Sequence, residues 1–307
     1  MKNIVLFVLS VLATIGCLNI WNVTYASTIL NTTIVNADWV LYTNGPNLDE
    51  IMNSNASLFI IDYSSDGTDK KAFTKTQIDN LRNSGKTILA YLNVGAAENW
   101  RYYWKKLDKG IILSPLQGWQ GEYYVKYWYD SWISIVKEYL GKIVNAGFDG
   151  VMFDWVNIYM SQTLQIDTKK SQRDLKYAMA DTLRKVMSTY PNLKYAFVNG
   201  DDLLVEFPDL IKYVRYVVVE SVFFSNLKSK VGTQEFENRI KTLTTLTQQN
   251  VIVLSVEYID NGNPLDKENA SRIKDYIRMC KGYGFLYYIA KSNQKLDTIN
   301  VPKIPKE

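Results

Sequence analysis

The chain has 307 residues, of which 47% are hydrophobic and 21% are charged; this composition excludes a disordered chain and is sufficient for one large core. The net charge of +4 is spread along the sequence, so it points to neither a nucleic-acid partner nor a membrane surface. Histidine is absent, which excludes Ser–His and Cys–His nucleophile pairs, histidine zinc sites and imidazole acid–base chemistry, and leaves carboxylates as the acids, bases and nucleophiles of any enzyme.

The N-terminus has the pattern of a secretory signal peptide. A positively charged start precedes an apolar stretch that is short for a membrane span, and Thr24 and Ala26 then occupy the −3 and −1 places of a cleavage site. The alternative is a lipoprotein in which Cys17 carries the lipid. The sequence predicts export, with a signal peptide over residues 1–26 and a mature domain over residues 27–307.

Eight apolar, β-rich runs follow, and most are continuous rather than alternating, as expected of parallel strands that are covered on both faces. These predicted strands lie at residues 39–43, 58–63, 87–94, 148–154, 195–199, 216–221, 251–257 and 284–289.

Amphipathic helical patterns separate the strands, and several end at a glycine such as Gly85, Gly147, and Gly282 or Gly284. They lie at residues 74–86, 131–147, 171–190, 233–249 and 268–284. This alternation in a single domain predicts a (β/α)8 TIM barrel. An open doubly wound sheet is the competing fold, but no GxGxxG or P-loop pattern favours it. Residues 99–130, rich in Trp and Tyr, form a long insertion after the third predicted strand.

Acidic or amide residues follow successive predicted strands, and in a barrel these strand ends meet at one mouth, where such enzymes place their active sites. They are Asp62, Glu98, Asp154, Asn199 with Asp201 and Asp202, Glu220 and Glu257. Capping of a helix is the simpler explanation for Asp66, Asp201 or Asp202 taken singly. Capping does not explain the whole series, because a purely structural ring of acids would repel itself.

Paired carboxylates are what glycoside hydrolysis requires: one protonates the leaving oxygen, and the other attacks the anomeric carbon or activates water. The aromatic insertion agrees with a sugar ligand, since Trp and Tyr rings stack on sugar rings. Packing of the insertion onto the barrel is an equally simple reading for about half of these aromatic side chains.

Seven blocks of the chain, in order, resemble the glycoside hydrolases related to endo-α-1,4-polygalactosaminidase, family 114. They include "DYSSDG" (62–67), "GFDGVMFDWVNIY" (147–159), "VNGDDLL" (198–204), "VVVESVFF" (217–224) and "LSVEY" (254–258). The resemblance implies a (β/α)8 barrel that cleaves α-1,4-linked galactosamine polymers within the chain. It also implies that Asp154 and Glu220 are the catalytic pair, which we assign as nucleophile and general acid/base; the reverse assignment stays open, as does whether hydrolysis retains or inverts the anomeric configuration.

The other polar residues of these blocks are predicted to bind substrate. They are Asp62, Tyr63, Tyr91, Glu98, Arg101, Asn199 and Glu257. Asp62, Glu98 and Glu257 are suited to pair with the ammonium group of galactosamine, and Arg101 to orient one of these carboxylates. Two positions depart from the family pattern: Ala96 and Asn157 stand where acidic residues are common. Both departures remove negative charge, which leaves another glycan open as the substrate.

Two other functions remain open at this point. One is a secreted barrel that binds carbohydrate without cleaving it, since one fold hosts many functions. The other is a hydrolase that holds Mg²⁺ or Ca²⁺ through carboxylates, although the chain has no ligand-spacing motif. The sequence therefore predicts a polysaccharide as the partner, no cofactor, no metal, no nucleic acid, and no membrane contact beyond the signal peptide.

Overall fold

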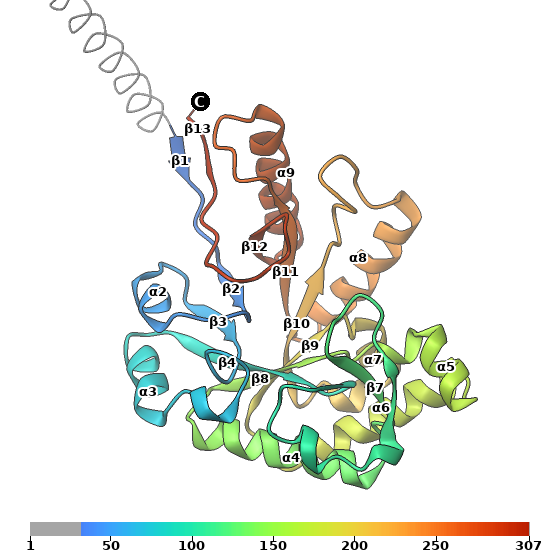
Figure 1. The fold of residues 1–307 in the computed structure, drawn as a ribbon. Coiled ribbons are helices and arrows are strands. Elements are labelled where there is room, and N and C mark those ends of the chain that lie inside the picture. The colour runs from blue at the N-terminus through green and yellow to red at the C-terminus, as the bar shows by residue number, and fades with distance from the viewer. Residues whose placement is uncertain (1–31, 307) are drawn as a thin grey trace, which may run out of the picture.

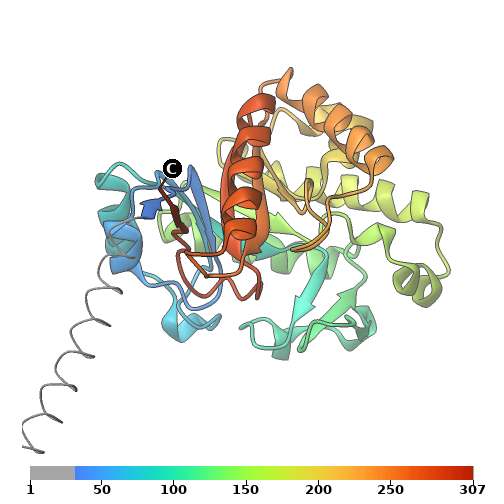
Figure 2. The ribbon, with the colours of Figure 1, turned by 90° about the horizontal axis from the view of Figure 1, so that it is seen from above.

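The computed structural model describes residues 32–306, and at its centre lies one eight-stranded parallel sheet that curls into a nearly closed barrel (Figures 1 and 2). Its neighbouring strands run in the order β12-β11-β10-β9-β8-β4-β3-β2. The bounds are β2 Trp39–Tyr42, β3 Leu58–Ile61, β4 Thr87–Asn93, β8 Gly150–Asp154, β9 Lys194–Val198, β10 Val214–Glu220, β11 Ile252–Asp260 and β12 Leu286–Lys291. The predicted barrel is confirmed, as are all of its predicted strands.

Helices cover the outside of the sheet (Figure 1). Those that the periodicity predicts are α3 Lys75–Asn83, α4 Asp130–Asn145, α6 Gln172–Met187, α8 Thr233–Thr247 and α9 Lys267–Tyr283. Their ends carry the expected signals: Thr74 and Gln77 form a capping box at α3, and Gly284 ends α9 at a φ of 72°. Short helices add to these, and they are too short to show a periodic pattern: α2 Leu48–Asn53, α5 Gln162–Thr168 and α7 Asp201–Glu206.

The barrel closes through side chains at the seam between β2 and β12. The backbone N–H of Asp38 donates to the carbonyl of Tyr287 at 3.2 Å. In return the N–H of Tyr287 donates to Asp38 Oδ2 at 3.1 Å, so that a carboxylate stands in for a strand carbonyl. The Trp39 indole then donates to the carbonyl of Leu286 at 3.2 Å. These contacts bring the first and last strands of the sheet together without a regular ladder.

The aromatic insertion folds into a small antiparallel sheet of its own, which the sequence did not predict. It consists of β5 Ala96–Glu98, β6 Ile112–Pro115 and β7 Glu122–Val125. In this sheet Glu98 lies directly opposite Glu122. A further two-stranded pair, β1 Thr32–Ile34 with β13 Lys303–Pro305, joins the beginning and end of the described chain.

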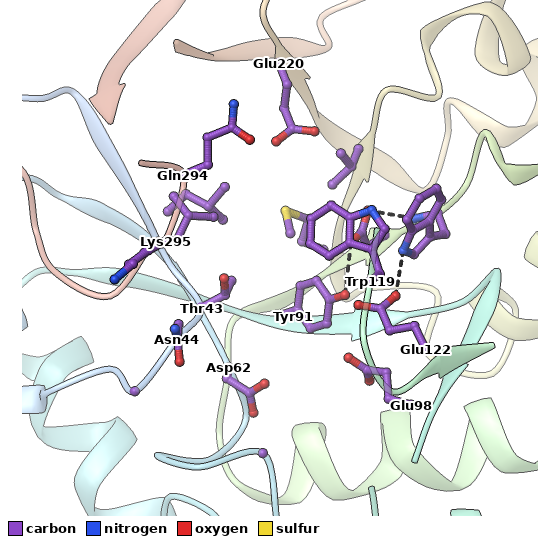
Figure 3. A pocket seen from close by; sticks show the side chains of 18 of the residues that line it. Thr43, Asn44, Asp62, Tyr91, Glu98, Trp119, Glu122, Glu220, Gln294 and Lys295 are labelled. Carbon is purple, nitrogen blue, oxygen red and sulfur yellow. Dashed lines mark hydrogen bonds between the residues drawn. The ribbon is translucent and has the colours of Figure 1, made fainter. Parts of the chain in front are cut away.

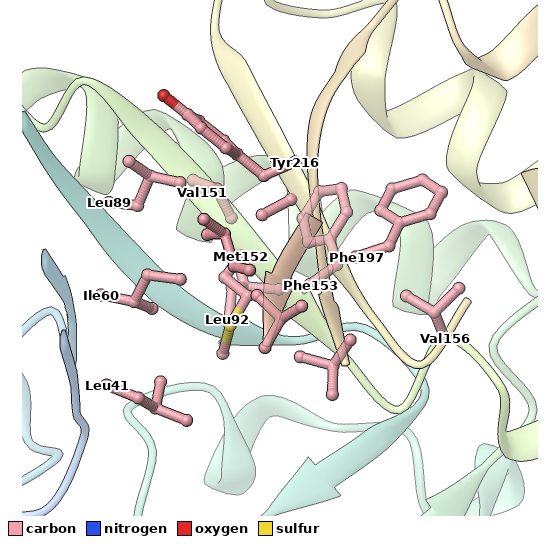
Figure 4. Packing of buried hydrophobic residues seen from close by; sticks show 14 of the residues in the cluster. Leu41, Ile60, Leu89, Leu92, Val151, Met152, Phe153, Val156, Phe197 and Tyr216 are labelled. Carbon is pink, nitrogen blue, oxygen red and sulfur yellow. The ribbon is translucent and has the colours of Figure 1, made fainter. Parts of the chain in front are cut away.

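Buried hydrophobic side chains fill the space between the barrel strands and the surrounding helices, and others, such as Leu41 and Met152, lie on the inner face of the barrel. Figure 4 shows side chains of this cluster from β2, β3, β4, β8, β9 and β10 packed together. Because side chains alternate along a strand, Val151 and Phe153 of β8 share one face while Met152 and Asp154 share the other. Within residues 32–306, no helix combines the length and apolar character that a membrane crossing needs.

Candidate active site

The carboxyl ends of the strands surround a cavity of about 710 Å³, a size typical of small-molecule sites. Its lining includes six acidic residues: Asp62, Asp66, Glu98, Glu122, Asp154 and Glu220. In Figure 3, Glu220 reaches into this pocket from one side, and Asp62, Glu98 and Glu122 lie on the other. Gln294 and Lys295, from the loop after β12, form a third side. The pocket is therefore strongly acidic.

Asp154 is the last residue of β8, and it shares the pocket face of that strand with Met152. Its Oδ2 accepts a hydrogen bond from the Tyr91 hydroxyl at 3.0 Å, and its Oδ1 accepts one from the backbone N–H of Trp155 at 2.7 Å. Burial raises the pKa of Asp154 to about 7, and the negative charge of Glu220 adds to the rise. Tyr91, a predicted substrate-binding residue, thus lies in the pocket and holds the carboxyl group.

Glu220 is the last residue of β10, and two side chains fix its carboxylate. The Tyr258 hydroxyl donates to Oε1 at 2.5 Å, and the Asn199 amide donates to Oε2 at 2.9 Å. Arg239 of α8 in turn donates to Asn199 Oδ1 at 3.1 Å and pairs with Asp201 at 2.8 Å. Asn199 therefore acts here as an orienting residue for Glu220, and Asp201 is held by a salt bridge.

The backbone turns sharply where β8, β9 and β10 reach the mouth. The residues at these turns, Trp155, Asn199 and Ser221, have φ values of 56°, 50° and 52°. Left-handed conformations are unfavourable for residues with a side chain, and they are concentrated at functional sites. One of these turns also packs closely against Gly95: a Cβ atom at position 95 would lie only 2.2 Å from the carbonyl oxygen of Trp155. Any larger residue at position 95 would displace the turn that follows Asp154.

Asp62 and Glu98 share one counter-ion, Arg101. The guanidinium contacts both oxygens of Asp62, at 3.0 and 2.7 Å, and both oxygens of Glu98, at 2.6 and 3.2 Å. All three side chains are buried. Burial raises the pKa of Glu98, and Arg101 opposes that rise. These residues line the pocket, but their charges are already largely compensated within the protein.

Glu122 also lies in the pocket, and the sequence did not point to it. Its Oε2 accepts hydrogen bonds from the Trp155 indole at 3.0 Å and the Asn93 amide at 3.2 Å. Burial raises the pKa of Glu122 to about 8, and the charges of Glu98 and Asp154 add to the rise. Glu122 begins a strand of the insertion and does not follow a barrel strand. A search for acidic residues at the ends of predicted barrel strands therefore could not find it. An acidic residue inside an aromatic β run is the signal that was present.

The aromatic side chains of the insertion divide into two groups. Trp100 and Trp119 line the pocket and remain 38% and 56% exposed, so part of each side chain is accessible to a ligand. Tyr103 and Tyr127 are buried in the core. Tyr258, which follows Glu257 in β11, is a further pocket residue that the sequence did not single out.

Tyr63 and Glu257, both predicted to bind substrate, do not line the cavity. Tyr63 is buried with its ring 5.5 Å from that of Tyr139. Glu257 is fully buried, and it accepts a hydrogen bond from the backbone N–H of Phe223 at 2.7 Å. Neighbouring strand residues point to opposite faces, and this places Tyr258 rather than Glu257 toward the pocket. Glu257 therefore anchors the chain just after Glu220.

The remaining acids do not cap helices: the short 3-10 turn at residues 69–71 follows Thr68, and α7 follows Gly200, and neither helix has a side-chain cap within the described chain. Asp66 accepts hydrogen bonds from the backbone and hydroxyl of Thr68 at 2.9 and 2.7 Å. Asp202 pairs with Lys176 at 2.8 Å. Of the two departures from the family pattern, Asn157 lines the pocket, whereas Ala96 is fully buried and does not line it. Among residues 32–306, no group of three or more acidic or cysteine side chains is arranged to hold a metal ion.

A family model for glycoside-hydrolase family GH114 matches residues 24–302. The chain belongs to family GH114. The resemblance that the sequence blocks indicated is thereby confirmed, and the family supports glycosidase activity on a polysaccharide.

Relatives of this GH114 chain come from distant organisms. An uncharacterized protein of Methanocaldococcus jannaschii is 31% identical over 275 residues, covering 85% of this chain and 78% of the relative. An uncharacterized protein of Thermotoga maritima is 30% identical over 275 residues, covering 86% of this chain and 83% of the relative.

Solved structures share the fold of this GH114 chain. The glycoside hydrolase domain of PelA from Pseudomonas aeruginosa has a TM-score of 0.65 at 15% identity, covering 86% of this chain and 97% of that domain. Aspergillus fumigatus Ega3, solved in complex with galactosamine, has a TM-score of 0.64 at 18% identity, covering 89% of this chain and 96% of Ega3.

The coupling between the two strand-end acids can be measured directly. In Glu220→Gln we expect the pKa of Asp154 to fall below its value of about 7, because the substitution removes a charge that raises it. Carboxyl carbon NMR titration of both proteins reports this shift. Asp181→Asn, which alters an exposed carboxylate of α6, serves as the control. An unchanged Asp154 pKa in Glu220→Gln would show that the two groups do not interact.

Asp154 should also lower the stability of the fold as the pH rises. The pKa of Asp154 is about 7 in the folded protein, against an ordinary value of 3.8. Between about pH 4 and pH 7, therefore, Asp154 is protonated in the folded protein but ionised in the unfolded chain. This stabilisation is complete below the unfolded pKa and is lost as the pH rises toward 7. We expect Asp154→Asn to increase the free energy of unfolding at about pH 8 by about 1–3 kcal/mol, measured by urea denaturation. A less stable variant at that pH would contradict the argument.

Proposed function

We propose that this protein hydrolyses α-1,4-linked galactosamine-containing polysaccharide, using Asp154 and Glu220 as its two catalytic carboxyl groups. The observation that carries the proposal is the convergence of these two acids, from the ends of β8 and β10, on one acidic and aromatic pocket. An acidic pocket favours a cationic polymer over a neutral one. Ega3, which shares the fold, was solved in complex with galactosamine, and this agrees with the choice of sugar.

The chemistry needs one proton on the catalytic pair. Asp154 attacks the anomeric carbon while Glu220 gives its proton to the leaving oxygen, which breaks the glycosidic bond and leaves a glycosyl ester. Glu220 then takes a proton from water as that water attacks the same carbon, and Asp154 is released. Burial raises the pKa of Asp154 to about 7, and the charge of Glu220 adds to the rise, so a proton is retained at Asp154 near neutral pH. The first step needs this proton on Glu220 and an ionised Asp154, so it requires transfer of the proton from Asp154 to Glu220; with the roles of the two acids reversed, Asp154 is already the protonated acid.

The surrounding residues serve this chemistry by position. Tyr91 and the Trp155 N–H hold the two oxygens of Asp154, while Tyr258 and Asn199 hold those of Glu220. These donors limit the rotation of each carboxyl group and so keep it aimed at the bond between two sugars. The exposed parts of Trp100 and Trp119 provide aromatic surfaces against which sugar units of the polymer can stack.

Hydrolysis is tested with a deacetylated α-1,4-galactosamine polymer and an assay for new reducing ends. We expect Asp154→Asn and Glu220→Gln each to reduce turnover by about 100-fold or more, because each removes a group that takes part in the transition state. Asp181→Asn, outside the pocket, should match the wild type. Retention of the polymer by the wild-type protein without any new reducing ends would instead identify a carbohydrate-binding protein.

Export is part of the proposal, since a polysaccharide of this kind is reached outside the cytoplasm. The signal peptide predicted at residues 1–26, and Cys17 within it, lie outside the described residues. We expect the exported protein to begin at Ser27, which N-terminal sequencing or intact mass measurement detects. A mature chain that begins at a lipid-modified Cys17 would show that the lipoprotein alternative is correct.

A further inference from the structure

The charges of the pocket can be matched with their partners one by one. Asp62 and Glu98 are both paired with Arg101, the buried cation beside them. Asp154 and Glu220 belong to the catalytic pair, and each receives hydrogen bonds on both oxygens. Glu122 is different from all of these. Its side chain is buried in the pocket wall, yet no ion pair within residues 32–306 compensates it.

The contacts of Glu122 leave one oxygen free for a ligand. Only neutral donors reach it, the Trp155 indole and the Asn93 amide, and both bind Oε2. No hydrogen bond from the described part of the chain reaches Oε1. The residue is only 6% exposed, so bulk water gives its charge little stabilisation. A buried carboxyl group in this situation stays protonated until a cation arrives, consistent with the rise of its pKa to about 8.

The position of Glu122 fits the amino group of one particular sugar unit. Its charge interacts with that of Asp154, and in Figure 3 it lies beside Tyr91, the residue that holds Asp154. In a 2-amino sugar the ammonium group sits on the carbon next to the anomeric carbon. When the anomeric carbon faces Asp154, the ammonium group is therefore only a few ångströms from the catalytic acids, in the region of Glu122.

We propose that Glu122 binds the ammonium group of the sugar unit whose anomeric carbon is attacked, and that it thereby selects deacetylated units for cleavage. The inference rests on the proposed function and adds the residue that decides which unit is cut. An ammonium group gives the carboxylate its missing counter-charge inside a partly dehydrated pocket, where the attraction is strong. An N-acetyl group is neutral, so it cannot replace this interaction.

This assignment replaces the earlier expectation for the amino group. Asp62 and Glu98 were predicted to bind it, but Arg101 already occupies both oxygens of each carboxylate. Glu257, the third candidate, lies outside the cavity lining. Glu122 is the acid of the pocket that has neither a cation nor a place in the catalytic pair and is still buried.

The test uses a partially N-acetylated α-1,4-galactosamine polymer, and the fragments are sequenced by mass spectrometry. The unit at each new reducing end is the one that occupied the reacting position, so its acetylation state reports selectivity independently of rate. We expect the wild-type protein to leave galactosamine at these ends with at least about tenfold preference, which corresponds to about 1.4 kcal/mol. In Glu122→Gln, which keeps the size of the side chain, we expect the ends to approach the composition of the polymer.

Two further variants make the result specific to Glu122. Glu122→Asp keeps a carboxylate and should keep most of the preference. Asp181→Asn removes one negative charge from the exposed face of α6, outside the pocket, and should leave the preference within about twofold of the wild type, because exposed charges are screened.

The outcomes separate this inference from the proposed function. A wild-type protein that releases no fragments would contradict the proposed function itself. A wild type that cuts without preference, or a Glu122→Gln variant that keeps the wild-type preference, would overturn the role of Glu122 alone. A folded Glu122→Gln variant as inactive as Asp154→Asn would also overturn it, because Glu122 would then be required for the chemistry rather than for selection.

Discussion

Repulsion among carboxyl groups in one partly dehydrated cavity is the constraint that organises this protein. Two like charges about 4 Å apart cost roughly 4 kcal/mol at the effective dielectric of a protein surface, so six acids cannot line one pocket without compensation. The protein uses three means: Arg101 neutralises Asp62 and Glu98, hydrogen-bond donors stabilise Asp154 and Glu220, and a bound proton removes the charge of Glu122 near neutral pH. This arrangement favours the binding of a cationic ligand, because a positive charge in the pocket reduces the repulsion among the carboxylates and compensates for their lost hydration.

Two parts of the chain contribute to the pocket in different ways. The barrel strands supply Asp154 and Glu220, the proposed catalytic pair, and their positions follow from the closure of a parallel sheet. The insertion between β4 and α4 supplies Glu98, Arg101, Glu122 and Trp119, which set the charge and shape of one wall. Gly95 joins the two parts, because its missing side chain lets the insertion approach the Trp155 carbonyl. Reaction chemistry and sugar selection can therefore vary separately in such a protein.

The features that hold the site in place lower the stability of the fold. Trp155, Asn199 and Ser221 adopt left-handed backbone conformations next to the two proposed catalytic acids. The buried carboxyl group of Glu257 anchors the chain after Glu220 through the N–H of Phe223, and its pKa is raised to about 8 by burial. A barrel without this site could replace such groups with neutral ones and gain stability, which is the usual relation between active sites and stability.

The sequence by itself determined the barrel and its strands, and it placed Asp154 and Glu220 at the ends of two of those strands. A continuous apolar run that ends in Asp154 or Glu220 is a local pattern, and the closure of parallel strands brings such ends to one mouth whatever the details of packing. Only the tertiary structure decided the roles of the other acids. Glu257 and Tyr258 differ by one position, yet the alternation of side chains turns the tyrosine to the pocket and the glutamate away from it. Glu122 stands out because no positively charged side chain among the described residues forms an ion pair with it in the folded protein. Its neighbours come from distant parts of the chain, so no local sequence pattern could show this.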